Sequence, residues 1–322
     1  MSRLPDSPTR PRDVHTDLGA VTDVVGRRAP FTIRLSRLAI RCFGAYSRMR
    51  RRPAPPPHAP VETAYGIHPK ERIAYLAPRE GAVPRSPVLY FHGGGWIIGS
   101  KDTYTPFLGF LAEAGHPVFN IGYPLAPENP HPGILRSLFR ALDWIAANHS
   151  EVTGYHAMGD SAGGNLSAML GLLAHDPERV TDVDPTRTQG LPLACRSIVS
   201  IYGVLDRLSW IEDGFPGART MLELHAGRGA FEPEVGPELA ITPMDLDLAA
   251  APPMLLTVGT EDPLLRSSRL LAERLAAGPG KVLLREYPGE PHGFFNFGTS
   301  ESAARMNTDV LEFLAAQEPG AA

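Results

Sequence analysis

The segment GDSAGG at 159–164 places a serine between glycines, where an apolar run gives way to a helical pattern. A serine on a sharp strand-to-helix turn, called a nucleophile elbow, has its hydroxyl exposed above a sheet. Gly159 and Gly163 suit such a turn, because its two arms approach too closely for side chains to fit between them. The pattern therefore predicts Ser161 as a nucleophile. We expect Asp160 to order the turn through hydrogen bonds to the backbone.

A second glycine-rich segment, HGGGW at 92–96, follows a strand-like apolar run at 87–91. Successive glycines leave backbone N–H groups uncovered, so two of them can stabilise one developing negative charge. We predict that the N–H groups of Gly93 and Gly94 form an oxyanion hole together with that of Ala162, which opens the helix after the elbow. The alternative is a tight glycine turn after an edge strand.

The acid and the base that a serine nucleophile requires follow in the last third of the chain. Asp262 follows a buried-strand pattern at 253–258, and His292 lies in the loop after the last strand pattern, at 281–287. The order serine, acid, histidine, with each residue on a loop after a strand, is that of α/β-hydrolases. Glu261 is the alternative acid, and we favour Asp262 for its place relative to the strand end.

These motifs resemble those of the hormone-sensitive-lipase family of carboxylesterases, in its bacterial branch with a GDSAG elbow. The resemblance covers residues 70–317 and includes YPLAPE at 123–128, DPL at 262–264 and HGF at 292–294. The family usually has arginine where this chain has Pro124, a position outside the proposed catalytic set.

The resemblance implies an α/β-hydrolase fold, with a mostly parallel sheet flanked by helices and a helical cap. It also implies hydrolysis of short- to medium-chain carboxylic esters of small molecules, and a homodimer formed through an edge strand. The reaction would pass through an acyl-enzyme, in which the histidine takes the proton of the serine and the acid orients the imidazole. That chemistry needs neither a metal nor an organic cofactor.

The chain is expected to divide into three parts. Residues 1–60 would form an N-terminal cap segment and linker, and residues 61–204 with 251–322 the catalytic α/β-hydrolase domain. Residues 205–250 lack strand character between two core strands and are expected to be a cap insertion. Because a cap excludes water and shapes the acyl and alcohol pockets, it would determine which substrates are accepted.

A basic amphipathic helix is expected at 31–52, where apolar residues recur at helical spacing among seven arginines. Such a helix suits an anionic membrane surface. In the resembled family, N-terminal helices pack over the active site as part of the cap, and we favour that interpretation. Before this helix the chain is polar, and after it the proline-rich stretch at 53–60 is typical of an extended linker.

After Tyr65, strand-like and helix-like runs alternate as a mostly parallel sheet with covering helices requires. Helices are expected at 105–114, 133–148, 162–174, 265–277 and 301–316, and further strands at 117–121 and 196–202.

Composition agrees with a single large core, since 43% of the 322 residues are hydrophobic. A net charge of −4 gives no reason to expect nucleic acid as a partner. Cys42 and Cys195 lie far apart, which suggests neither a disulfide framework nor a metal cluster and favours a reducing compartment. The N-terminus has no signal-peptide pattern and no run reaches about 18 apolar residues, so we expect a soluble cytoplasmic protein and do not favour membrane contact.

Pocket residues and two other functions stay open at this point. Trp96, Tyr202 and Phe294 are aromatic neighbours of the motifs and candidates for the pocket lining, although aromatic residues are also common in cores. The same triad would serve an amidase, a deacetylase or an acyltransferase acting on a metabolite. A non-catalytic binding protein is the other alternative, because plant gibberellin receptors resemble this family, but they have replaced the histidine that His292 retains here.

Overall fold

An eight-stranded sheet is the centre of the fold, with strand order β1-β2-β4-β3-β5-β6-β7-β8. The computed structural model describes residues 28–51, 53, 55–236, 239–297 and 300–320. The strands are β1 (Val61–Ala64), β2 (Arg72–Leu76), β3 (Val88–Phe91), β4 (Val118–Ile121), β5 (Gly154–Asp160), β6 (Ala194–Ile201), β7 (Met254–Gly259) and β8 (Val282–Tyr287). Along the sheet, every neighbouring pair from β4 to β8 is parallel. At one edge, β1 pairs antiparallel with β2, and β2 pairs antiparallel with β4.

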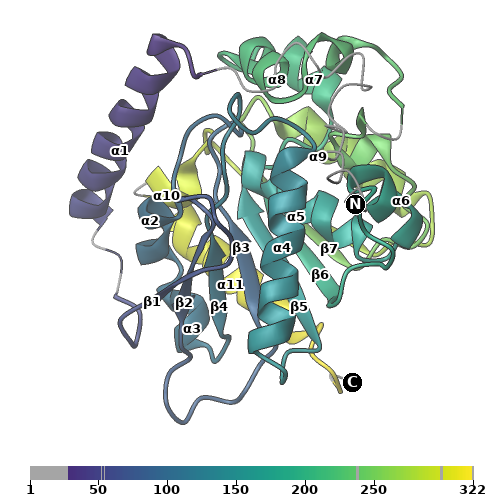
Figure 1. The fold of residues 1–322 in the computed structure, drawn as a ribbon. Coiled ribbons are helices and arrows are strands. Elements are labelled where there is room, and N and C mark those ends of the chain that lie inside the picture. The colour runs from purple at the N-terminus through teal and green to yellow at the C-terminus, as the bar shows by residue number, and fades with distance from the viewer. Residues whose placement is uncertain (1–27, 52, 54, 237–238, 298–299, 321–322) are drawn as a thin grey trace, which may run out of the picture.

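The central strands are buried on both faces, which explains their continuous apolar sequences. In β3, Leu89 and Phe91 point into one core cluster, while Val88 and Tyr90 point into the other. The first cluster includes residues of α4, α5 and α9, and the second includes residues of α3 and α11, so helices cover both faces (Figure 1). The predicted mostly parallel α/β sheet flanked by helices is confirmed.

Helices and helical turns connect these strands. They are α1 (Phe31–Arg51), α2 (Lys101–Tyr104), η2 (Thr105–Phe107), α3 (Gly109–Glu113), α4 (Gly133–Asn148), α5 (Ala162–Leu173), α6 (Pro177–Val183), α7 (Arg207–Glu212), α8 (Ala218–Ala226), η3 (Arg228–Phe231), η5 (Pro243–Asp245), α9 (Leu265–Ala276), α10 (Phe294–Phe297) and α11 (Glu301–Ala315). The expected helices at 133–148, 162–174, 265–277 and 301–316 agree with α4, α5, α9 and α11 within one residue.

The helix expected at 105–114 is wrong as a continuous element. The structure divides this stretch between η2 and α3, with Leu108 between them. Pro106 has no N–H to donate and its ring clashes with the preceding turn, which explains why the α-helical bonding of α2 ends before it. The antiparallel strands β1 and β2 were not predicted; both are short, and β1 is mostly exposed.

The segment 205–250 contains the helices α7 and α8 and the helical turns η3 and η5, joined by irregular chain. The helices α7 and α8 lie beyond the ends of the strands at which β5 and β7 finish (Figure 1). Residues 237 and 238 of this segment lie outside the described residues. Two polar side chains hold α7 in place. Asp206 caps its first turn by accepting a hydrogen bond from the Ser209 N–H, and the buried guanidinium of Arg207 binds Asp245 at 3.1 Å.

The helix predicted at 31–52 corresponds to α1, and residues 1–27 and Arg52 lie outside the described residues. The α1 helix lies beside α2 and α10 at one side of the molecule (Figure 1). Arg37 connects it to the body, donating hydrogen bonds to the carbonyls of Ile97 and Ala126 and forming a bidentate pair with Glu128. Within the described ranges, none of the helices has both the length and the apolar character that crossing a membrane requires.

Candidate active site

Ser161 lies on the sharp turn between β5 and α5, with φ 54° and ψ −120°. This left-handed backbone conformation is unfavourable for a residue with a side chain, and such strain collects at functional sites. The flanking glycines make the turn possible. A Cβ atom on Gly163 would lie 2.0 Å from the carbonyl oxygen of Phe91, and one on Gly159 would lie 2.4 Å from the carbonyl oxygen of Gly163.

His292 connects Ser161 to Asp262 through both of its ring nitrogens. Its Nε2 lies 3.1 Å from Ser161 Oγ, and its Nδ1 lies 2.8 Å from Asp262 Oδ2. The side chain of Asp262 is fully buried and also accepts a hydrogen bond from the Leu264 N–H, which fixes its orientation. Glu261, the alternative acid, is exposed and has no such contact with the histidine. The structure thus brings together Ser161, Asp262 and His292.

Asp160 connects the elbow to the HGGGW loop. Its buried carboxylate accepts hydrogen bonds from the Tyr90 hydroxyl at 2.7 Å, the Gly93 N–H at 2.9 Å and the Asn296 side-chain amide at 3.1 Å. Burial raises the pKa of Asp160 to about 6, although the bonds from Tyr90 and the Gly93 N–H favour the charged form. Because Asp160, beside the nucleophile, binds the first glycine of the HGGGW loop, it fixes the position of this loop relative to Ser161.

One of the three N–H groups predicted to form the oxyanion hole has another partner in the structure. The N–H of Gly93 donates to Asp160, so it is occupied and cannot also point at a substrate. Gly94 and Gly95 both line the cavity beside Ser161, and no acceptor among the described residues takes the N–H of either. Together with Ala162 at the start of α5, they are the donors that remain for a developing oxyanion. Gly93 was therefore wrong as a donor, and Gly95 was missed.

An apolar cavity of about 210 Å³ opens at Ser161 and His292. Three residues that line this cavity come from the 205–250 segment, namely Trp210, Phe215 and Met221. The ring of Phe215 stands edge-on to that of His292 at 4.9 Å. The sequence analysis did not identify these residues, because a segment without strand pattern gives no clue to which of its side chains point inward.

Of the three aromatic residues proposed for the pocket, only Tyr202 lines this cavity, with its ring edge-on to His292 at 4.7 Å. Trp96 and Phe294 are fully buried outside the lining. Trp96 stacks on His225 at 4.4 Å, and Phe294 packs between Tyr202 and Tyr287. Trp96 packs against Trp210 and Phe294 against Tyr202, so both lie behind residues that line the cavity. Their prediction as lining residues is therefore wrong.

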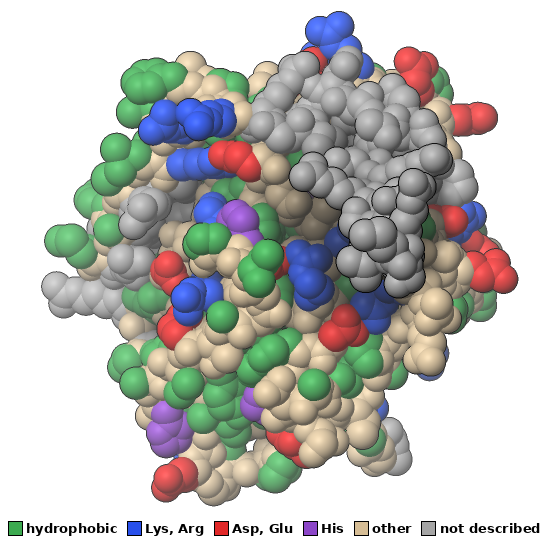
Figure 2. Space-filling view, viewed as in Figure 1, with side chains coloured by type: hydrophobic (Ala, Val, Ile, Leu, Met, Phe, Trp, Pro, Cys, Tyr) green, Lys and Arg blue, Asp and Glu red, His purple; other side chains and the backbone are tan. Residues whose placement is uncertain are grey.

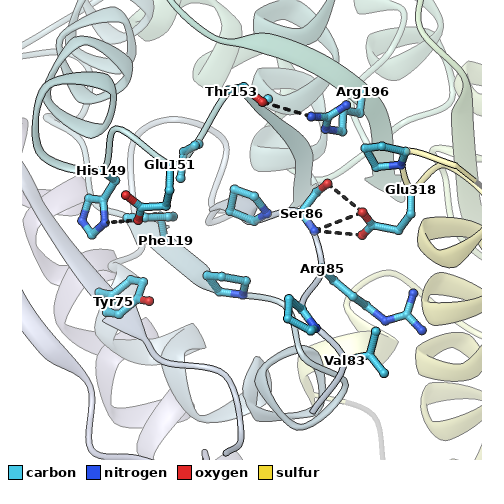
Figure 3. A pocket seen from close by; sticks show the side chains of 16 residues that line it. Tyr75, Val83, Arg85, Ser86, Phe119, His149, Glu151, Thr153, Arg196 and Glu318 are labelled. Carbon is cyan, nitrogen blue, oxygen red and sulfur yellow. Dashed lines mark hydrogen bonds and ion pairs between the residues drawn. The ribbon is translucent and has the colours of Figure 1, made fainter. Parts of the chain in front are cut away.

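A larger cavity of about 520 Å³ lies at the opposite ends of the strands (Figure 3). Pro87, Pro117 and Thr153 line it, and each directly precedes a central strand. Glu318 lies at one side of this cavity, where it accepts hydrogen bonds from the N–H and the hydroxyl of Ser86. Since ligands of parallel α/β sheets bind at the carboxyl ends of the strands, volume alone does not make this cavity the active site.

Comparison with known sequences agrees with this geometry. The family model described as an alpha/beta hydrolase fold matches residues 88–296. Carboxylesterase NlhH of Mycobacterium tuberculosis is 30% identical over 243 residues, which are 69% of this chain and 70% of that protein. Hormone-sensitive lipase of Mus musculus is 39% identical over 107 residues, which are 31% of this chain and 14% of that protein.

Solved structures share the fold. An esterase of Pyrobaculum calidifontis superposes with a TM-score of 0.73 at 22% sequence identity, covering 90% of this chain and 94% of that one. A bacterial heroin esterase superposes with a TM-score of 0.67 at 25% identity, covering 81% of this chain and 85% of that one.

The raised pKa of Asp160 predicts a pH-dependent stability. The folded chain holds the Asp160 proton up to about pH 6, whereas an ordinary aspartate releases it near 3.8. The stabilisation due to this proton is present below pH 3.8 and is lost as the pH rises through about 6. Relative to Asp160→Asn, the wild type should lose about 2 kcal/mol of unfolding free energy between about pH 4 and 7.

Urea unfolding of both proteins at several pH values measures this difference. A difference that stays constant over the range would show that Asp160 titrates at its ordinary pKa.

Proposed function

The chain belongs to the α/β-hydrolase family, in the branch that includes hormone-sensitive lipase, and from this we propose that it is a serine hydrolase cleaving short- to medium-chain carboxylic esters. The observation that carries the proposal is the hydrogen-bonded series Ser161, His292, Asp262 at the mouth of an apolar cavity. Relatives named carboxylesterase or esterase support the ester as the substrate class.

The geometry gives each of the three residues one role. A carboxylate only accepts hydrogen bonds, so His292 Nδ1 carries the proton that faces Asp262. The lone pair of Nε2 then faces the Ser161 hydroxyl and takes its proton as Oγ attacks the ester carbonyl. The proton passes to the departing alcohol, and a water molecule repeats the cycle on the acyl-enzyme. Gly94, Gly95 and Ala162 would stabilise the oxyanion of both tetrahedral intermediates.

The size of the cavity supports short acyl groups. At about 210 Å³ it lies below the roughly 300–1,000 Å³ of pockets that enclose drug-sized ligands. Its apolar lining suits a hydrocarbon chain. Met221 limits its depth beside the glycine loop, because a Cβ atom on Gly95 would lie only 2.0 Å from Met221 Sδ. We infer that the enzyme prefers short- to medium-chain acyl groups.

We also propose the domain division expected from the sequence. Residues 205–250 act as a cap insertion, since Trp210, Phe215 and Met221 from this segment form walls of the cavity. The N-terminal segment joins the same end of the molecule, because α1 contacts α10, which begins two residues after His292.

A cytoplasmic homodimer completes the proposal. Cys42 and Cys195 are both free, which suits a reducing compartment. The strand β8 is an edge of the sheet with partly exposed residues, so its outer side can pair with the same strand of a second copy.

Light scattering of the purified protein tests the dimer. It should report twice the chain mass of 34.8 kDa, and a value equal to one chain would exclude the dimer.

Hydrolysis of p-nitrophenyl esters from acetate to palmitate tests the proposed reaction. We expect rapid turnover of the short esters by the wild type and loss of at least about 10³-fold in kcat for Ser161→Ala and for His292→Ala. Equal rates in all three proteins would contradict the serine mechanism. Faster turnover of matched anilides than of esters would favour the amidase alternative, and no turnover of either would favour a binding protein.

The oxyanion donors are tested in the same assay with Gly94→Ala. Gly94 has φ 118°, and a Cβ atom there would lie 2.4 Å from the Ile98 carbonyl oxygen, so alanine must displace the loop and its N–H groups. We expect kcat to fall by about 10²–10³-fold. Gly81→Ala is the matched control, because Gly81 also has positive φ but faces open space. Similar rates for both variants would show that the loop does not stabilise the transition state.

A further inference from the structure

The apolar side of α1 faces outward. Phe31, Leu35, Leu38 and Met49 are each more than half exposed. The first three are spaced four and three residues apart, and Met49 follows Leu38 by eleven residues, about three turns, so all four lie along one stripe. Figure 2 shows hydrophobic side chains at the outer edge of the molecule where Figure 1 places this helix. We expected this helix to be part of a cap, in which such a stripe would pack inward. The structure buries the opposite side instead.

The inward side of α1 is polar in its contacts. Arg37, which is half-buried, makes the hydrogen bonds to the carbonyls of Ile97 and Ala126 and the pair with Glu128. On a helical wheel, with 100° per residue, Arg37 lies about 125° from the centre of the apolar stripe. The helix is therefore anchored by one face and offers its apolar face to a partner.

The positive charge of α1 indicates an anionic partner. The 21 residues of α1 include six arginines and neither aspartate nor glutamate. Arg34 is exposed and precedes Leu38 by one helical turn, so it lies beside the apolar stripe. Apolar side chains along one side with cations beside them are typical of helices that lie in the interface of an anionic bilayer.

We propose that α1 binds the protein to the surface of membranes containing anionic phospholipid, with its apolar stripe inserted among the acyl chains. Its length of about 31 Å allows several turns to lie flat in the interface. Since α1 contacts α10, close to His292 in the chain, binding would hold the mouth of the active site near the lipid surface. The binding itself does not depend on the proposed esterase activity.

Vesicle flotation of the full chain tests the proposal. We expect at least about tenfold more protein to float with phosphatidylglycerol–phosphatidylcholine vesicles than with phosphatidylcholine alone, and this difference to fall in 0.5 M salt. The double variant Leu35→Gln with Leu38→Gln should lose most of the binding. Because both residues are exposed, the variant should keep the wild-type rate on a water-soluble ester, and Ser161→Ala should still float.

Ile67→Gln with Val83→Gln is the matched control, because these residues are the exposed apolar side chains of loops outside α1. It should bind vesicles like the wild type. Equal flotation of both double variants would overturn the proposal. So would a wild type that does not bind anionic vesicles, or stripe substitutions that separate a dimer without changing flotation, since the stripe would then be a contact between two copies.

Discussion

The close approach of the Ser161 turn to the end of β3 is the constraint on which the rest of the site depends. Gly163 lies so near the Phe91 carbonyl that no side chain fits between them. His92 follows Phe91 directly, so this packing brings the glycine loop alongside the nucleophile. The Gly93 N–H then binds Asp160, and the two N–H groups after it line the cavity. The strained serine is thus held between a strand, a helix and a loop that are all buried.

Neighbouring strands supply the other two residues. The strands β7 and β8 pair in parallel, so the loops after them leave the sheet side by side. Asp262 comes from the first loop and His292 from the second, which is why residues 30 apart in the sequence meet at 2.8 Å. Tyr202, at the end of β6, also has positive φ and packs against the imidazole. Rigid strand ends therefore set the geometry, and the helical segment above them forms part of the cavity wall.

Much of this arrangement was predictable from the sequence, because the buried parallel strands are continuous apolar runs and the glycines mark close approaches. The choice between Gly93 and Gly95 was not predictable, since three consecutive glycines look alike until the bond from Asp160 is known. The sequence predicted that 205–250 helps to shape the pocket but not which of its side chains do so, and it left open which way the apolar face of α1 points. Periodicity reveals that a helix has an apolar side, but the packing partner decides which way that side points.

The central claim is that His292 activates Ser161, and covalent labelling tests it most directly. Diethyl p-nitrophenyl phosphate forms a phosphorus–oxygen bond with an activated serine and releases p-nitrophenolate. Intact and peptide mass spectrometry should find one diethylphosphoryl group per chain, on Ser161, and almost none on His292→Ala treated for the same time. Labelling of another residue, or labelling of Ser161 at the same rate without the histidine, would contradict the account.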